Sequence, residues 1–203
     1  MRNLTITDFS EKTASKEAVP GGGGVSASVG ALSSALAQMV CNLTIGKPKY
    51  IMHTVELEDI KEEADIIRNN LLDCINSDAE SFYPLSKAYA IDKNNPKRDE
   101  ILEECLKQAA SSPMLILKYC TRIIDLDSRL SEIGSKLSVS DAGTSVMLAY
   151  GAMHGAYINV LVNTKLMKDR NYASGLETEA KELIDEYSSL ALKCYQKVIE
   201  RLS

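Results

Sequence analysis

The chain has 203 residues, of which 45% are hydrophobic, 25% charged and 5% aromatic, and its formal net charge is −5. This composition predicts one globular domain, and its abundance of Ala, Leu, Ile and Ser favours packed helices over a sheet. The chain has no basic block, no apolar N-terminal core of a signal peptide and no evident membrane span. We therefore expect a cytoplasmic location and neither a nucleic-acid nor a membrane partner.

The N-terminal part predicts two helices on either side of a glycine run. Thr7 or Asp8 is suited to cap a short helix that extends to about Lys16. Pro20 then precedes four glycines. An ordered glycine run indicates positive φ angles or close packing against the backbone, and at a helix start it also suits an anion. A flexible linker is the alternative interpretation.

An almost uncharged helix is predicted from residue 25 to residue 44. A helix that is small and apolar on nearly all sides is buried on most of them, either in a core or at a subunit interface. The pattern therefore predicts a central position in the fold or an oligomer.

The rest of the chain predicts further helices and no strand. A long helix over residues 54–89 is interrupted by Pro84, which should kink it, and a polar turn follows at residues 92–98. The later helices are expected at residues 99–124 with a bend at Pro113, and at 128–137, 141–167 and 176–202. We therefore predict a single-domain, all-α bundle over residues 1–203.

Asp78 interrupts the apolar stripe of the helix over residues 54–89, where a core residue belongs. A buried carboxylate needs a partner or has a raised pKa, and such a group is suited to proton transfer. The alternative is that a local kink carries Asp78 to the solvent.

The helix over residues 141–167 carries a small, polar face, made of Asp141, Ser145, Leu148, Ala152, Gly155, Asn159 and Asn163. This face permits close helix packing, and buried amides must also find a hydrogen-bond partner or a ligand. Asp141 and Asn159 lie about 27 Å apart along a helix, so one small ligand cannot touch both. Either Asp141 caps the helix, or the two ends serve separate sites across a subunit boundary.

The cysteines and histidines give no metal or nucleophile signature. The five cysteines are widely spaced and are interpreted as buried, reduced thiols: Cys41, Cys74, Cys105, Cys120 and Cys194. His53 and His154 have no metal-ligand neighbours at usable spacing, so we expect no metal site.

Five motifs in order resemble the cyclodeaminase domain of the formiminotransferase-cyclodeaminase family, which includes stand-alone methenyltetrahydrofolate cyclohydrolases. They begin at Pro20 (PGGG), Asn42 (NLTIGKPKY), Asp78 (DAESF), Ser140 (SDAG) and Asn159 (NVLVN). Two positions depart from the family pattern: Gly24 replaces a usual Ser, and residues 90–93 replace a Leu-Pro-Lys-like segment.

The resemblance implies an all-helical homodimer that acts on a tetrahydrofolate derivative, with no separate cofactor. It implies Asp78 as the catalytic group, and cyclisation of 5-formiminotetrahydrofolate to the 5,10-methenyl compound with release of ammonia. Two alternatives are hydrolysis of the methenyl compound and a folate-binding dimer without catalysis. The expected substrate-binding residues are Gly21, Gly22, Gly23, Asn42, Lys47, Lys49, Phe82, Asp141, Asn159 and Asn163. Lys47 and Lys49 either meet the glutamate tail of folate or form a solvated basic turn.

Overall fold

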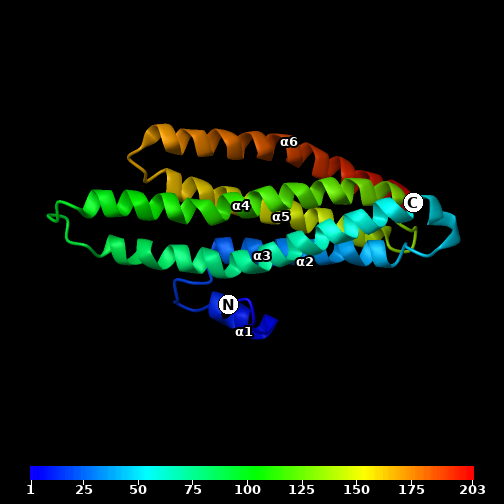
Figure 1. The fold of residues 1–203 in the computed structure, drawn as a ribbon, viewed down its shortest axis with the longest axis horizontal. Helices are drawn as coiled ribbons and strands as arrows, with labels where there is room; N and C mark the ends of the chain where they lie inside the picture. The colour runs from blue at the N-terminus through cyan, green and yellow to red at the C-terminus, as the bar shows by residue number, and fades with distance from the viewer.

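The computed structural model describes all residues, 1–203, and contains helices and no strand, which confirms the all-α prediction (Figure 1). The α-helices are α1 (Ile6–Thr13), α2 (Gly22–Asn42), α3 (Thr54–Tyr89), α4 (Arg98–Ile133), α5 (Val139–Thr164) and α6 (Arg170–Leu202). A 3-10 helix, η1 (Pro48–His53), leads into α3.

Five of the helices, α2 to α6, form the bundle around the core. α2 packs against α3, α4 and α5, while α6 covers α4 and α5. Large apolar side chains such as Leu71, Leu117 and Met153 are fully buried between them. The short α1 has no buried residue and stands off from the bundle beneath α2 and α3 (Figure 1). The chain ends beside the α2–α3 connection, at the opposite end of the molecule from the α3–α4 loop.

The two central apolar helices are only partly covered. α2 and α5 are both long and apolar enough to cross a membrane by length and composition, so the expectation that no stretch has these properties was wrong. The core helix of a soluble bundle passes the same test. Each helix has an 18-residue window that is apolar enough, and 56% of this window is buried in α2 but only 39% in α5. The expectation of burial on most sides concerned α2 alone, of whose window just over half is buried, and α5 keeps an apolar outer face.

Several helix boundaries differ from the predicted ones because local capping side chains lie at other positions than expected. The cap of α1 is Thr5, whose hydroxyl accepts the Asp8 N–H at 3.1 Å, and not Thr7 or Asp8. Asp169 accepts the Tyr172 N–H at 3.1 Å, so α6 begins six residues earlier than predicted. The predicted helices over residues 99–124 and 128–137 are one helix, α4.

The two prolines lie inside helices as expected, whereas Asp141 plays a different part from the expected one. Pro84 and Pro113 both lie inside continuous helices. Ser138 occupies the N-cap position of α5, and Asp141 lies in the first turn. The interpretation of Asp141 as the helix cap is therefore wrong, although a carboxylate in a first turn still stabilises a helix by its charge.

Candidate active site

A cavity of about 210 Å³ lies where α2 begins, between α3, α4 and α5. Its wall contains many of the residues that the sequence analysis selected. It is lined by Ala18, Val19, Gly21, Gly22, Gly23, Asp78, Ser81, Phe82, Ala109, Pro113, Asn159, Val162 and Asn163. Three of the five motifs thus meet in space, although they lie up to about 140 residues apart in the chain.

The glycine run forms the first turn of α2, and close packing explains why it carries no side chains. A Cβ atom on Gly23 would lie 2.1 Å from Oδ1 of Asp78, and one on Gly22 would lie 2.9 Å from Nδ2 of Asn159. The only glycine with positive φ is Gly46, so the positive-φ and linker interpretations of the run are both wrong. The bare backbone here makes room for two functional groups.

Asp78 is the only titratable side chain in the cavity wall. It is half-buried, and burial raises the pKa of its carboxyl group, while the backbone N–H of Gly24 acts in the opposite direction. Its carboxylate lies against Gly23, so a kink at Pro84 has not turned it away from the cavity. A carboxyl group of raised pKa at a cavity wall can take up and return a proton near neutral pH.

Asn159 and Asn163 present acceptor oxygens to the cavity. The Asn159 amide nitrogen donates to the Gly155 carbonyl at 2.8 Å, and the Asn163 amide nitrogen donates to the carbonyls of Asn159 at 2.8 Å and Ala109 at 3.3 Å. Neither side-chain oxygen accepts a hydrogen bond from the protein. The two amides are therefore oriented to accept N–H or O–H groups of a ligand.

The small-residue face of α5 also serves packing, as the alternative interpretation held. Gly155 lies against α2, because a Cβ atom there would come within 2.4 Å of the Ser26 hydroxyl. Ser33 donates to the Ser145 carbonyl at 2.7 Å, deep between the two helices. These contacts hold α2 at the distance that places Gly22 beside Asn159.

The structure does not bring every selected residue to this cavity. Asn42 ends α2, about 30 Å from Gly22 along the helix. Lys47 donates to the Ser135 hydroxyl at 3.2 Å, and Lys49 lies over the Tyr50 ring, 5.7 Å from its centre. Asp141 lies near them, at the start of α5. Within one chain the selected residues form two groups at opposite ends of α2 and α5.

Two features of the structure were missed by the sequence reasoning. Ser81 lines the cavity, and its place one helical turn after Asp78 was an available signal. Asp127 is fully buried in α4, where Oδ2 accepts the Ser145 hydroxyl at 2.6 Å and Oδ1 has no partner. Asp127 follows Leu117, Cys120 and Ile124 at helical spacing, so a carboxylate in an apolar stripe was an available signal here too.

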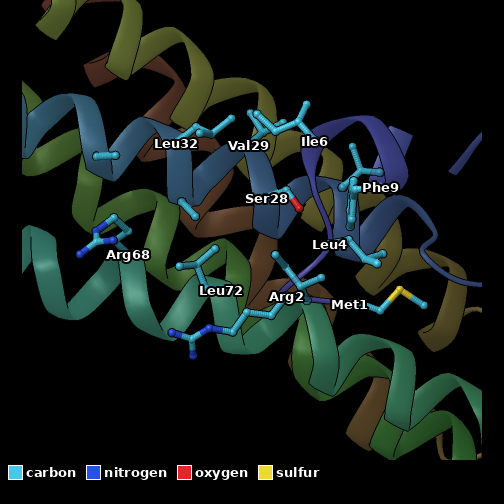
Figure 2. A pocket seen from close by; sticks show the side chains of 14 residues that line it. Met1, Arg2, Leu4, Ile6, Phe9, Ser28, Val29, Leu32, Arg68 and Leu72 are labelled. Carbon is cyan, nitrogen blue, oxygen red and sulfur yellow. The ribbon is translucent and has the colours of Figure 1, made fainter. Parts of the chain in front are cut away.

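A larger apolar groove of about 420 Å³ lies between the N-terminal segment and helices α2 and α3 (Figure 2). Its only charged residues are Arg2, paired with Asp73, and Arg68, paired with Asp65. Leu32 and Val29 form part of its α2 wall (Figure 2). With no free titratable group, this groove offers packing surface and no proton-transfer chemistry.

The cysteines are all unpaired and buried, as predicted. Burial raises the pKa of Cys41 and Cys194 to about 12, so both thiols stay protonated at neutral pH. No group of three or more His, Cys, Asp or Glu side chains is arranged to hold a metal ion. His154 instead hydrogen-bonds the Ser188 hydroxyl at 3.0 Å.

Comparisons with known proteins agree with the five motifs. The family model described as formiminotransferase-cyclodeaminase matches residues 5–182. Methenyltetrahydrofolate cyclohydrolase of Methylorubrum extorquens is 36% identical over 99% of both chains. The crystal structure of formiminotetrahydrofolate cyclodeaminase from Thermotoga maritima matches 98% of this chain and 96% of its own, with a TM-score of 0.84 and 31% identity.

A longer relative shares only one part with this chain. Formimidoyltransferase-cyclodeaminase of Mus musculus is 27% identical over 93% of the chain, but the match covers 36% of its own length. The chain thus spans about a third of this relative.

Proposed function

Because the chain belongs to the formiminotransferase-cyclodeaminase family, whose members act as folate one-carbon enzymes, we propose that it hydrolyses 5,10-methenyltetrahydrofolate to 10-formyltetrahydrofolate. The observation that carries this proposal is the cavity in which Asp78, the glycine turn and two amide oxygens converge. The choice of hydrolysis follows the relative that is 36% identical over 99% of both chains, which is named a cyclohydrolase.

Asp78 acts as the proton-transfer group in the proposed reaction. Water attacks the methenyl carbon and gives one proton to the Asp78 carboxylate, forming a tetrahedral carbon. As the bond from this carbon to N5 breaks, Asp78 returns the proton to N5, and the hydroxyl proton is released as the formyl carbonyl forms. One group can serve both transfers because burial raises the pKa of Asp78, so its carboxylate takes up a proton more readily than an exposed one does.

The remaining wall of the cavity positions the substrate. The glycine turn lets the flat pterin approach the backbone closely, because no Cβ atom projects from Gly22 or Gly23. The free oxygens of Asn159 and Asn163 accept the pterin N–H groups. Phe82 supplies an aromatic surface at the same wall.

Cyclodeamination is the second candidate, and it is favoured by the similarity to the Thermotoga maritima enzyme. In this reaction N10 of 5-formiminotetrahydrofolate attacks the formimino carbon and loses its proton to Asp78. The formimino group enters protonated, as an amidinium, so its nitrogen is an –NH2 group after the attack. The proton held by Asp78 then converts this group to ammonia, which departs and leaves the methenyl cation. Both reactions use one tetrahedral carbon and one shuttling proton, so the same cavity accommodates either.

The experiment is an absorbance assay of the purified chain at the near-ultraviolet band of the methenyl compound. Loss of this band from methenyl substrate, faster than in buffer, supports hydrolysis. Gain of the band from formimino substrate supports cyclodeamination instead. If the chain binds either folate and changes neither absorbance, it is a folate-binding protein without catalysis and the proposal fails.

A further inference from the structure

Pro113 lies in the interior of α4, where a proline leaves one backbone carbonyl without its usual helical partner. Proline has no backbone N–H, so the carbonyl of Ala109, four residues earlier, receives no hydrogen bond from position 113. The proline ring also crowds this carbonyl and turns it away from the helix axis. Ala109 is buried, and a buried carbonyl without a partner is costly. This carbonyl therefore needs a donor from another part of the chain.

The donor comes from α5. Nδ2 of Asn163 donates to the Ala109 carbonyl at 3.3 Å, across 54 positions of the chain. The same nitrogen donates to the Asn159 carbonyl at 2.8 Å, within α5. A side-chain amide nitrogen carries two hydrogens, so both are engaged: one within α5 and one across to α4.

These two hydrogen bonds fix which atom of the Asn163 amide is free. If the amide turned over, Oδ1 would lie against two carbonyl oxygens, and neither contact would contain a hydrogen. Nδ2 therefore stays with the carbonyls, and Oδ1 remains available as an acceptor. The amide of Asn159 is held less firmly, because its Nδ2 donates to the Gly155 carbonyl of its own helix at 2.8 Å and to no other helix.

Pro113, Ala109 and Asn163 all line the cavity that contains Asp78. We infer that Pro113 is a positioning residue of this site: it keeps the Ala109 carbonyl free to hold Asn163, whose amide oxygen then accepts an N–H group of the ligand. A ligand carbonyl at this point would meet Oδ1 with no hydrogen between them, so the site selects a donor. The effect on folate rests on the proposed function, whereas the hydrogen bond between α4 and α5 does not.

The chain offers a matched control in Pro84. This proline lies inside α3 as Pro113 lies inside α4, and it leaves the carbonyl of Glu80 without its helical partner. Glu80 is exposed, so water can satisfy its carbonyl, and Pro84 does not line the cavity. Alanine at either position restores the missing N–H and draws the carbonyl back to the helix. The two variants therefore differ in what the freed carbonyl does.

The hydrogen bond is tested by NMR of the protein without folate. Asn163→Asp removes the side-chain N–H signals of Asn163 and so assigns them. In the wild type we expect the N–H that points to the Ala109 carbonyl to be protected from exchange with solvent. Pro113→Ala should make it exchange about two- to tenfold faster, the effect of one lost hydrogen bond, and Pro84→Ala should not. Unchanged exchange in Pro113→Ala, or an equal increase in Pro84→Ala, would overturn the inference.

Steady-state kinetics test whether this hydrogen bond matters for the substrate. We expect Pro113→Ala to raise KM for the methenyl compound about two- to tenfold with little change in kcat, because Asn163 contacts a part of the substrate that does not react. Pro84→Ala should keep the wild-type KM. An unchanged KM in Pro113→Ala, or a lowered kcat alone, would show that Pro113 does not position the binding amide.

A double variant separates an effect through Asn163 from a general change of the cavity wall. Asn163→Ala removes the amide, so adding Pro113→Ala to it should raise KM no further. A second increase as large as that of the single Pro113→Ala variant would overturn the inference. A wild-type chain that turns over neither folate would refute the proposed function, and the exchange of the Asn163 N–H groups would then decide the inference by itself.

Discussion

At the scale of single residues, the cavity depends on a carboxyl group held in an unfavourable environment. Asp78 faces a glycine backbone, and the N–H of Gly24 is the hydrogen-bond donor that favours its charged form. Burial raises its pKa, so the folded protein holds the Asp78 proton more tightly than the unfolded chain does. Such a group contributes stability at low pH and loses it as the pH rises through the pKa of the folded state.

Replacing Asp78 by Asn should therefore separate activity from stability. We expect Asp78→Asn to lower turnover by about 10²–10⁴-fold, the range for removing a general acid or base. At pH 7 the variant should unfold at a higher temperature than the wild type, and this difference should shrink below pH 4. Absorbance assays and thermal unfolding at both pH values measure these effects. Full turnover would contradict the role of Asp78, and a lower melting temperature at pH 7 would contradict the sign of its pKa shift.

Asp127 makes a second pH-dependent contribution, deep in the core and away from the cavity. Burial raises its pKa well above the ordinary 3.8, and the Ser145 hydroxyl acts in the opposite direction. The titratable groups that its charge influences are the thiols Cys41 on α2 and Cys194 on α6, both protonated at neutral pH. The stability that Asp127 provides is thus present below pH 3.8 and falls as the pH rises through its raised pKa.

Asp127→Asn should reduce this pH dependence while it keeps an acceptor for Ser145. We expect the free energy of unfolding of the wild type to fall from pH 4 towards neutral pH more steeply than that of the variant. Urea unfolding at a series of pH values measures both curves. Parallel curves would mean that Asp127 does not titrate in this interval.

At the scale of the elements, the start of α2 is decided by what lies against it and not by helix propensity. Glycine is a poor helix former, yet Gly22, Gly23 and Gly24 lie within the first turn of α2. At Gly23 the neighbour is the Asp78 carboxylate, whereas at Gly24 the nearest atom is Cβ of Pro20 at 3.3 Å. Adjacent glycines of one helix turn therefore have different roles.

Alanine at these two positions should distinguish the roles. Gly23→Ala forces the Asp78 carboxylate to move, because the new Cβ atom would lie 2.1 Å from Oδ1, and we expect turnover to collapse. Gly24→Ala meets Pro20 less closely and should keep most of its turnover. Both gain helix propensity of about 1 kcal/mol, which offsets part of any strain. Steady-state kinetics and thermal unfolding of the two variants measure the contrast, and equal losses of turnover would contradict it.

At the scale of the whole molecule, α2 and α5 keep apolar side chains that the bundle does not cover. The buried faces of these helices fill the bundle core, and their outer faces remain exposed in one chain. The homodimer that the resemblance implies stays a prediction, and sedimentation of the purified chain measures it.

The sequence by itself determined the helical class, the exact span of α3 and the family, because apolar periodicity and short motifs are local properties. It also identified Asp78, since a carboxylate in an apolar stripe is visible without coordinates. Only the tertiary structure decided that α4 is continuous through Asp127. It also decided that close packing against Asp78 and Asn159 requires the glycines. The positions of Asn42, Lys47, Lys49 and Asp141 outside the cavity were likewise decided by the tertiary structure. These features depend on contacts between residues distant in the chain, and no local pattern of side chains records such contacts.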